Sequence, residues 1–144
     1  MSKIQARNYQ KKEEKWNVIT HGFGLILSIV GMVLLIVRAS LYEDAWHIVS
    51  FSIYGASMVI LYSASTFFHA SKPGELRKKL NVFDHASIFL LIAGTYTPFV
   101  LITVRGGWGW SIFGVVWGLA IAGIVLKFFF TGRFEKISTA IYVI

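Results

Sequence analysis

The chain has 144 residues, of which 56% are hydrophobic and only 15% are charged. Soluble domains carry about a quarter charged residues, so this composition, with a mean hydropathy of +0.64, indicates a membrane protein. The net charge of +7 could suggest a nucleic-acid partner. We expect none, because the basic residues are clustered between apolar runs and are not interleaved with aromatic residues on one surface. The chain has no cysteine, which excludes disulfides and a thiolate zinc site and leaves the redox compartment open.

Four long apolar runs predict an all-α fold, a polytopic transmembrane helical bundle. We divide the chain into a basic cytoplasmic leader, residues 1–17, which we expect to be partly disordered or to lie along the lipid headgroups, and a transmembrane helical domain, residues 18–144. The predicted spans cover residues 18–37, 48–68, 85–104 and 108–130. A helix of about 20 residues is about 30 Å long, which is enough to cross a hydrocarbon core. The first run exceeds the apolar core of a secretory signal, about 7–15 residues, so we interpret it as a retained span.

A fifth apolar run starts near residue 137 and reaches only to residue 144. Eight residues of helix measure about 12 Å, which is far short of a crossing. We therefore interpret this run as the start of a fifth span and expect the sequence to be a fragment of a longer protein.

The basic residues alternate between the two sides of the predicted bundle. All Lys and Arg residues except Arg38 and Arg105 lie in the leader, in the connection 69–84 or in residues 127–136. By the positive-inside rule these three segments are cytoplasmic. We expect a multi-pass plasma-membrane protein with a cytoplasmic amino terminus and with membrane lipids as its partners. The sequence leaves the oligomeric state open.

Three features predict how the helices pack. The second span is rich in serine, glycine and alanine, which allow close approach and place it inside the bundle. The Thr97-Pro98 step predicts a kink in the third span, because proline removes a backbone donor and clashes with the preceding turn. The Gly114-x-x-x-Gly118 motif predicts a packing face on the fourth span.

Polar and ionisable side chains gather at the cytoplasmic ends of the first three predicted spans. Ser65 and His69 are four residues apart and so share one face of a helix. Asp84 and His85 open the next span, and His21 lies at the same end of the first span. Because ionisable groups in a bilayer are costly and usually face the bundle interior, this layer is a candidate metal or proton-handling site.

Each of these residues also has a purely structural interpretation. His21 and His85 could be interfacial histidines that only make hydrogen bonds. Asp84 could cap the third predicted helix, and Ser65 could bond to the carbonyl four residues earlier. His69 favours a site more strongly, because it shares a face with Ser65 and adjoins the basic connection. Neutral imidazole is a good zinc ligand, and catalytic zinc keeps three protein ligands and a water, on which a nearby carboxylate could act.

Motifs along the whole chain resemble those of the bacterial hemolysin III family. They are Glu14-x-x-Asn17-x-x-Thr20-His21, Ser65-x-x-x-His69, and Asp84-His85-Ala86 leading into Ala93-Gly94-Thr95-Tyr96-Thr97-Pro98. That family is related to the progestin and adiponectin receptors within a superfamily of membrane-embedded metal-dependent hydrolases. The resemblance implies a seven-helix bundle with a cytoplasmic amino terminus, of which this chain would be the first part.

The resemblance also implies a zinc site near the cytoplasmic face. His69 would be the metal ligand, Asp84 would act on the water at the zinc, and Ser65 would support them. The two other zinc ligands of the family come from an H-x-x-x-H pair in the last helix, which this sequence does not contain. The zinc ligand set is therefore incomplete in this chain, and we interpret His85 as a neighbour of Asp84 rather than as a ligand.

Three functions follow from these observations and stay open at this point. The first is a zinc-dependent hydrolase of lipid amide or ester bonds. The second is a pore-forming cytolysin, which the name hemolysin implies. The third is a receptor-like or membrane-homeostasis protein in which the zinc is structural.

Overall fold

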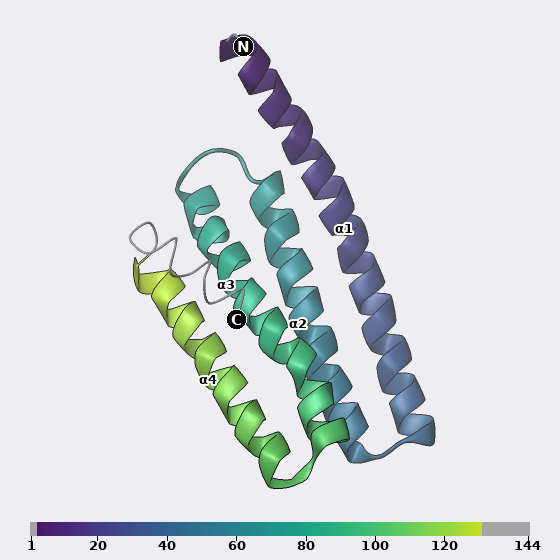
Figure 1. The fold of residues 1–144 in the computed structure, drawn as a ribbon. Helices are drawn as coiled ribbons and strands as arrows, with labels where there is room; N and C mark the ends of the chain where they lie inside the picture. The colour runs from purple at the N-terminus through teal and green to yellow at the C-terminus, as the bar shows by residue number, and fades with distance from the viewer. Residues whose placement is uncertain (1–2, 131–144) are drawn as a thin grey trace.

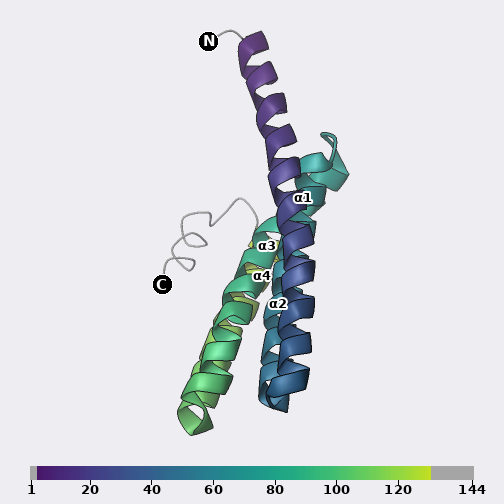
Figure 2. The same cartoon turned by 90° about the vertical axis from the view of Figure 1, so that its right-hand side faces the viewer.

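The computed structural model describes residues 3–130, which form a row of long antiparallel helices (Figure 1). The elements are α1 (Lys3–Tyr42), α2 (Ala45–Ala70), α3 (Glu75–Pro98), the π-helix η1 (Phe99–Val104) and α4 (Gly106–Phe130). Helices that follow one another in the sequence pack against one another, α1 on α2, α2 on α3 and α3 on α4. In the view turned by 90°, the amino-terminal end of α1 projects beyond the other helices (Figure 2).

Four helices of the described chain are long and apolar enough to cross a membrane. Many large apolar side chains of these helices lie on the outer surface of the protein; Ile26 and Leu34, for example, are 60% and 64% exposed. Such surfaces are stable in lipid, where a helix also satisfies all of its backbone hydrogen bonds internally. The predicted all-α, polytopic fold class is therefore confirmed. The predicted fifth run, from residue 137, lies outside the described residues.

The basic leader forms the amino-terminal part of the first helix. α1 begins at Lys3, so residues 3–17 are helical and lead without a break into the first apolar run. This stretch contains no glycine or proline and many good helix formers, among them Gln, Lys, Glu and Ala. The consequence for the site is that residues of the leader are carried on the same rigid element as His21.

Helix α2 lies between α1 and α3, as its small residues predicted. Its buried residues are Ser50, Gly55, Ser57 and Ser65. A Cβ atom added at Gly55 would lie 2.7 Å from Cβ of Met32 in α1, so the glycine permits the close approach of these two helices.

The Thr97-Pro98 step, where we predicted a kink, lies at the boundary between α3 and a π-helix. α3 ends at Pro98 and the chain continues as η1, because proline cannot donate the hydrogen bond that a regular α-helix needs. The fully buried Thr97 hydroxyl donates to the Ala93 carbonyl at 2.8 Å and accepts from Trp117 Nε1 at 3.1 Å. This bond joins the end of α3 to α4.

The predicted packing face at Gly114 and Gly118 is not used within residues 3–130. Both glycines are exposed, with no atom within 4 Å of an added Cβ in the described part of the chain. Helix α4 instead packs through Gly123, where an added Cβ would lie 2.5 Å from the ring of buried Phe89. Lipid and protein core are both apolar, so the motif alone does not indicate which face of the helix turns inward.

Candidate functional site

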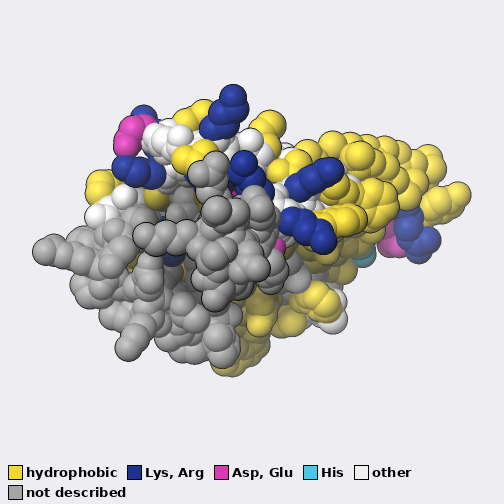
Figure 3. All heavy atoms as spheres, turned by 90° about the horizontal axis from the view of Figure 1, so that it is seen from above, with side chains coloured by type: hydrophobic (Ala, Val, Ile, Leu, Met, Phe, Trp, Pro, Cys, Tyr) yellow, Lys and Arg dark blue, Asp and Glu magenta, His cyan; other side chains and the backbone are white. Residues whose placement is uncertain are grey.

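The helical ends that carry the predicted site lie at the basic end of the bundle. The amino-terminal part of α1 and the connection between α2 and α3 meet there (Figure 1). Seen from this end, Lys and Arg side chains are spread over the described surface (Figure 3). Basic residues of both segments contribute: Lys11, Lys12, Lys15, Lys72, Arg77, Lys78 and Lys79.

A histidine and a serine form a polar contact between α1 and α2. His21 Nδ1 lies 2.6 Å from Ser65 Oγ, and Ser65 is only 4% exposed. Among apolar helices a buried hydroxyl needs a partner, and this contact supplies it. The alternative in which Ser65 only bonds to its own helix is thus not the arrangement seen, because its hydroxyl reaches across to α1.

His69 lies one turn further along α2 and also faces α1. Its ring is 5.4 Å from the His21 ring, centroid to centroid, at an interplanar angle of 90°. Its Nδ1 atom lies 2.8 Å from Oε2 of Glu14, two turns before His21 on α1. The shared face predicted for Ser65 and His69 is confirmed, because both side chains contact α1.

Glu14 also binds Arg77, which comes from the first turn of α3. The Arg77 guanidinium donates to Glu14 Oε1 at 2.5 Å, and the Glu14 side chain is 36% exposed. Three helices therefore meet in the chain of contacts from Arg77 through Glu14 to His69. A groove of about 680 Å³ opens beside it, and its lining includes Lys11, Asn17 and Pro73.

Asp84 and His85 lie on α3, about two turns after Arg77. His85 Nδ1 lies 2.7 Å from the Asn81 carbonyl of its own helix. The Asp84 carboxylate is partly exposed and makes no hydrogen bond or ion pair with another residue of the described chain. The structure therefore brings Ser65, His69 and His21 together and records no contact between them and Asp84.

Sequence reasoning did not assign a role to Glu14 or to Arg77. Glu14 is the first residue of the Glu14-to-His21 motif, and its spacing of seven places it on the His21 face of α1. That spacing was a usable signal. Arg77 offered none, because it is one of several basic residues in the connection and only its contacts distinguish it.

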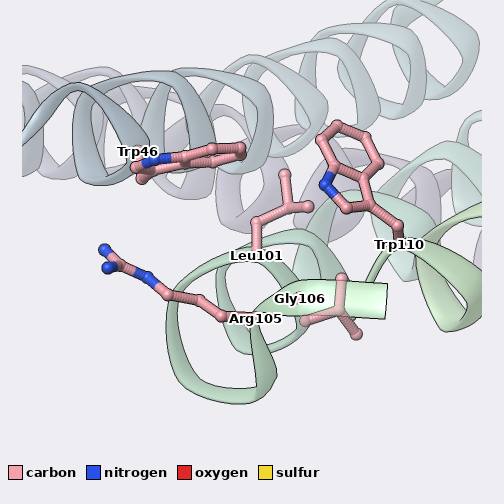
Figure 4. Close-up of a pocket in the computed structure, with 6 residues that line it drawn as sticks. Trp46, Leu101, Arg105, Gly106 and Trp110 are labelled. Carbon is pink, nitrogen blue, oxygen red and sulfur yellow. The ribbon is translucent and has the colours of Figure 1, made fainter. Parts of the chain in front are cut away.

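A second cavity lies at the opposite end of the bundle. It has a volume of about 240 Å³ and is lined by residues that include Trp46, Leu101, Arg105 and Trp110 (Figure 4). The two indole rings are 6.0 Å apart, centroid to centroid. Interfacial tryptophans of this kind mark the boundary between hydrocarbon and water.

Asp44 connects two chain turns beside this cavity. Its carboxylate accepts hydrogen bonds from His47 Nδ1 at 2.7 Å and from Arg105 at 2.8 Å, and it caps the start of α2. The pKa of Asp44 falls from its ordinary value of 3.8 to about 2, mainly through the His47 hydrogen bond, with Arg105 adding to it against partial desolvation. The carboxylate therefore stays ionised at neutral pH and tethers α2 to the start of α4.

The donor atoms at the basic end suit a metal only in part. Within residues 3–130 no group of three or more His, Asp, Glu or Cys side chains is arranged to hold an ion. His69 by itself has the chemistry of an imidazole ligand, since Nδ1 contacts a carboxylate and Nε2 has no hydrogen-bond partner among the described residues. The described chain therefore fits the role of one zinc ligand and not of a complete ligand set.

Fold and site together define a multi-pass helical membrane protein with a histidine–serine–carboxylate network at its basic end. Residues 9–144 match the family model described as "Haemolysin-III related", and the chain belongs to this family. The family resemblance of the sequence motifs is thereby confirmed.

Similar proteins agree with this assignment. Over 133 residues the chain is 50% identical to "Hemolysin-3" of Bacillus cereus, an alignment that covers 92% of this chain and 61% of the relative. It is 47% identical to the "Hemolysin-3 homolog" of Bacillus subtilis (strain 168), covering 92% of this chain and 62% of that protein. It is also 27% identical to the human "Monocyte to macrophage differentiation factor", covering 90% of this chain and 56% of that protein. The chain thus spans about three fifths of the length of these bacterial relatives, and no solved structure matches it.

Proposed function

We propose that this chain is part of a zinc-dependent hydrolase that cleaves lipid amide or ester bonds at the cytoplasmic face of the plasma membrane. The observation that carries the proposal is His69, whose Nε2 has no hydrogen-bond partner in the described chain while its Nδ1 contacts a carboxylate. An ionisable side chain at the end of a membrane span is a functional candidate by default. His69 sits beside a second imidazole and a buried serine, which a purely apolar helix contact would not require.

The surroundings of His69 suit a lipid substrate. The groove beside it is lined by Lys11 and Arg77 and also by Glu13 and Glu14. Arg77 is paired with Glu14, so Lys11 would be the cation that attracts the phosphate of a headgroup. We infer from the positive-inside rule that the basic end of the bundle faces the cytoplasm.

The roles of the residues follow from their chemistry. Zinc, when bound, would polarise the lipid carbonyl and lower the pKa of a water molecule. His69 Nε2 would be one ligand, and the remaining ligands would come from outside the described residues. Asp84 would accept the proton of the attacking water, and Ser65 would hold the neighbouring His21 ring in place by its hydroxyl. Asp84 has no described partner that competes for its oxygens, which suits a proton acceptor.

The test uses the full-length protein, purified into lipid nanodiscs, with zinc content and turnover measured on the same samples. A fluorescent lipid amide and the matching ester serve as substrates, with and without chelator. We expect His69→Ala to lose zinc and turnover, and Asp84→Asn to keep zinc and lose turnover. His47→Ala, at the opposite end of the bundle, is the matched control and should keep both.

Three results would overturn the proposal. Unchanged zinc content in His69→Ala would remove the site assignment. Zinc binding without turnover of either substrate would favour a structural metal in a receptor-like protein. Release of a trapped dye from vesicles by zinc-free protein would instead favour the cytolysin that the relatives' name suggests.

A further inference from the structure

The two carboxylate oxygens of Glu14 contact residues of two different helices. Oε2 contacts Nδ1 of His69 in α2 at 2.8 Å, and Oε1 accepts from Arg77 in α3 at 2.5 Å. These partners are 55 and 63 residues away in the sequence, so the contacts are tertiary and not a by-product of helical spacing. The Arg77 and His69 side chains are only 22% and 16% exposed, so the network is screened less by water than a surface ion pair.

Arg77 is itself held in one position. Its other terminal nitrogen donates to the carbonyls of Phe68 at 3.1 Å and Ser71 at 2.8 Å, at the carboxyl end of α2. Its guanidinium carbon lies 4.5 Å from the centre of the Phe68 ring. These contacts use the planar fork of arginine to satisfy helix-end carbonyls and to orient Glu14 at the same time.

We propose that Glu14, held by Arg77, is a positioning residue that fixes His69 with its proton on Nδ1 and its Nε2 lone pair directed to a zinc ion. This inference rests on the proposed function for the role of Nε2. An ionised carboxylate can only accept a hydrogen bond, so the Nδ1 atom beside it carries the proton. In the neutral imidazole the lone pair is then on Nε2, which is the arrangement that carboxylate–histidine–zinc triads use.

His21 shows by contrast why the carboxylate matters. Its Nδ1 contacts the Ser65 hydroxyl, which can either donate or accept. A hydroxyl partner therefore leaves the His21 tautomer open, whereas Glu14 decides that of His69. Of the two neighbouring imidazoles, only His69 has one nitrogen defined as a donor by its partner.

The first readout is the tautomer of His69, which needs no metal. Full-length protein is labelled with ¹⁵N-histidine in nanodiscs, and the His69 signals are identified by their loss in His69→Gln. We expect metal-free wild type to show a protonated Nδ1 and an unprotonated Nε2. In Glu14→Gln the amide can donate as well as accept, so we expect a mixture of both tautomers.

The second readout is zinc affinity, measured by competition with a chromophoric chelator. Loss of a carboxylate behind a zinc-binding histidine typically weakens binding by about 10- to 100-fold, and we expect this for Glu14→Gln. Glu75→Gln is the matched control, because it removes the exposed Glu75–Lys78 pair at the start of α3 and should not change affinity. Arg77→Lys keeps the positive charge but loses the planar fork of the guanidinium, so we expect a loss of zinc affinity smaller than that of Glu14→Gln. This milder variant keeps the test available if Glu14→Gln does not fold.

The outcomes separate this inference from the proposed function. Suppose that the wild type binds zinc but that Nε2 of His69 carries the proton in the metal-free protein. This result overturns the inference and leaves the proposed function standing. Equal zinc affinity in wild type and Glu14→Gln does the same. Wild type that binds no zinc overturns the proposed function and with it the metal role of Glu14, while the tautomer measurement still decides whether Glu14 sets the proton on His69.

Discussion

The contact between Gly123 and Phe89 predicts a specific stability change when α4 is altered. Gly123 is buried, and a Cβ atom added there would lie 2.5–2.8 Å from three atoms of the Phe89 ring. Phe89 is only 3% exposed and packs in a cluster with Ala93 and Ala120, so the ring has little room to move. Gly123→Ala should therefore force the two helices apart or push the ring out of its preferred rotamer.

Gly114→Ala, in the same helix, is the control for the size of this effect. Overpacking of a filled core costs about 1–3 kcal/mol, whereas alanine in place of glycine favours a helix by about 1 kcal/mol. Gly114→Ala gains the same helix propensity without a contact, because nothing lies within 4 Å of its added Cβ in the described residues. We expect Gly123→Ala to be about 1–3 kcal/mol less stable than Gly114→Ala.

The measurement is reversible unfolding in mixed lipid–detergent micelles, followed by circular dichroism and by tryptophan fluorescence. When the free energies of unfolding of the two alanine variants are subtracted, the gain in helix propensity that both share cancels. If the variants unfold at the same detergent fraction, Phe89 does not fill the space at Gly123, and the packing of α3 on α4 described above is wrong.

Three further predictions concern single polar side chains. Trp117→Phe removes the bond to the buried Thr97 hydroxyl and should cost about 0.5–1.5 kcal/mol in the same unfolding assay; no change would show that this bond does not join α3 to α4. Ser50 has a fully buried hydroxyl without a hydrogen-bond partner in the described chain, so Ser50→Ala should leave the free energy of unfolding unchanged or raise it, and a loss above about 1 kcal/mol would point to a partner for that hydroxyl. The pKa of Asp44 is lowered from 3.8 to about 2 in the folded protein. As the pH falls, the unfolded chain therefore takes up the proton before the folded protein does. The contribution of Asp44 to stability is complete above pH 3.8 and is lost as the pH falls towards 2. Asp44→Asn should abolish this part of the acid dependence, and an unchanged profile between pH 4 and pH 2, about the range that the two pKa values define, would contradict it.

Much of the architecture follows from local features of the sequence. Each span could be found because a hydrocarbon core requires about 20 consecutive apolar residues, whatever the neighbouring helices do. The end of α3 at Pro98 also has a local cause, since the missing N–H group belongs to that residue alone. The shared face of Ser65 and His69 needed only the pitch of a helix.

The packing faces were harder to predict, as the glycines of α4 show. In a soluble helix the polar residues mark the outside, but in a membrane the lipid side and the protein side are both apolar. Gly114 and Gly118 formed the more recognisable motif, yet Gly123 makes the contact with α3. Only the rotation of α4 about its own axis, which the described neighbours set, distinguishes these positions.

The sequence by itself determined that this is a membrane bundle, which runs of residues are long and apolar enough to cross a membrane, and that His69 and Ser65 lie together at its basic end. Only the tertiary structure decided which side chains these residues meet. Glu14 reaches His69 because α1 is helical on the amino-terminal side of the first apolar run and lies against the end of α2. Arg77 reaches Glu14 because the turn after α2 returns α3 to the same end. Such contacts depend on how three helices are placed and rotated against one another, and no local pattern in an apolar sequence records that.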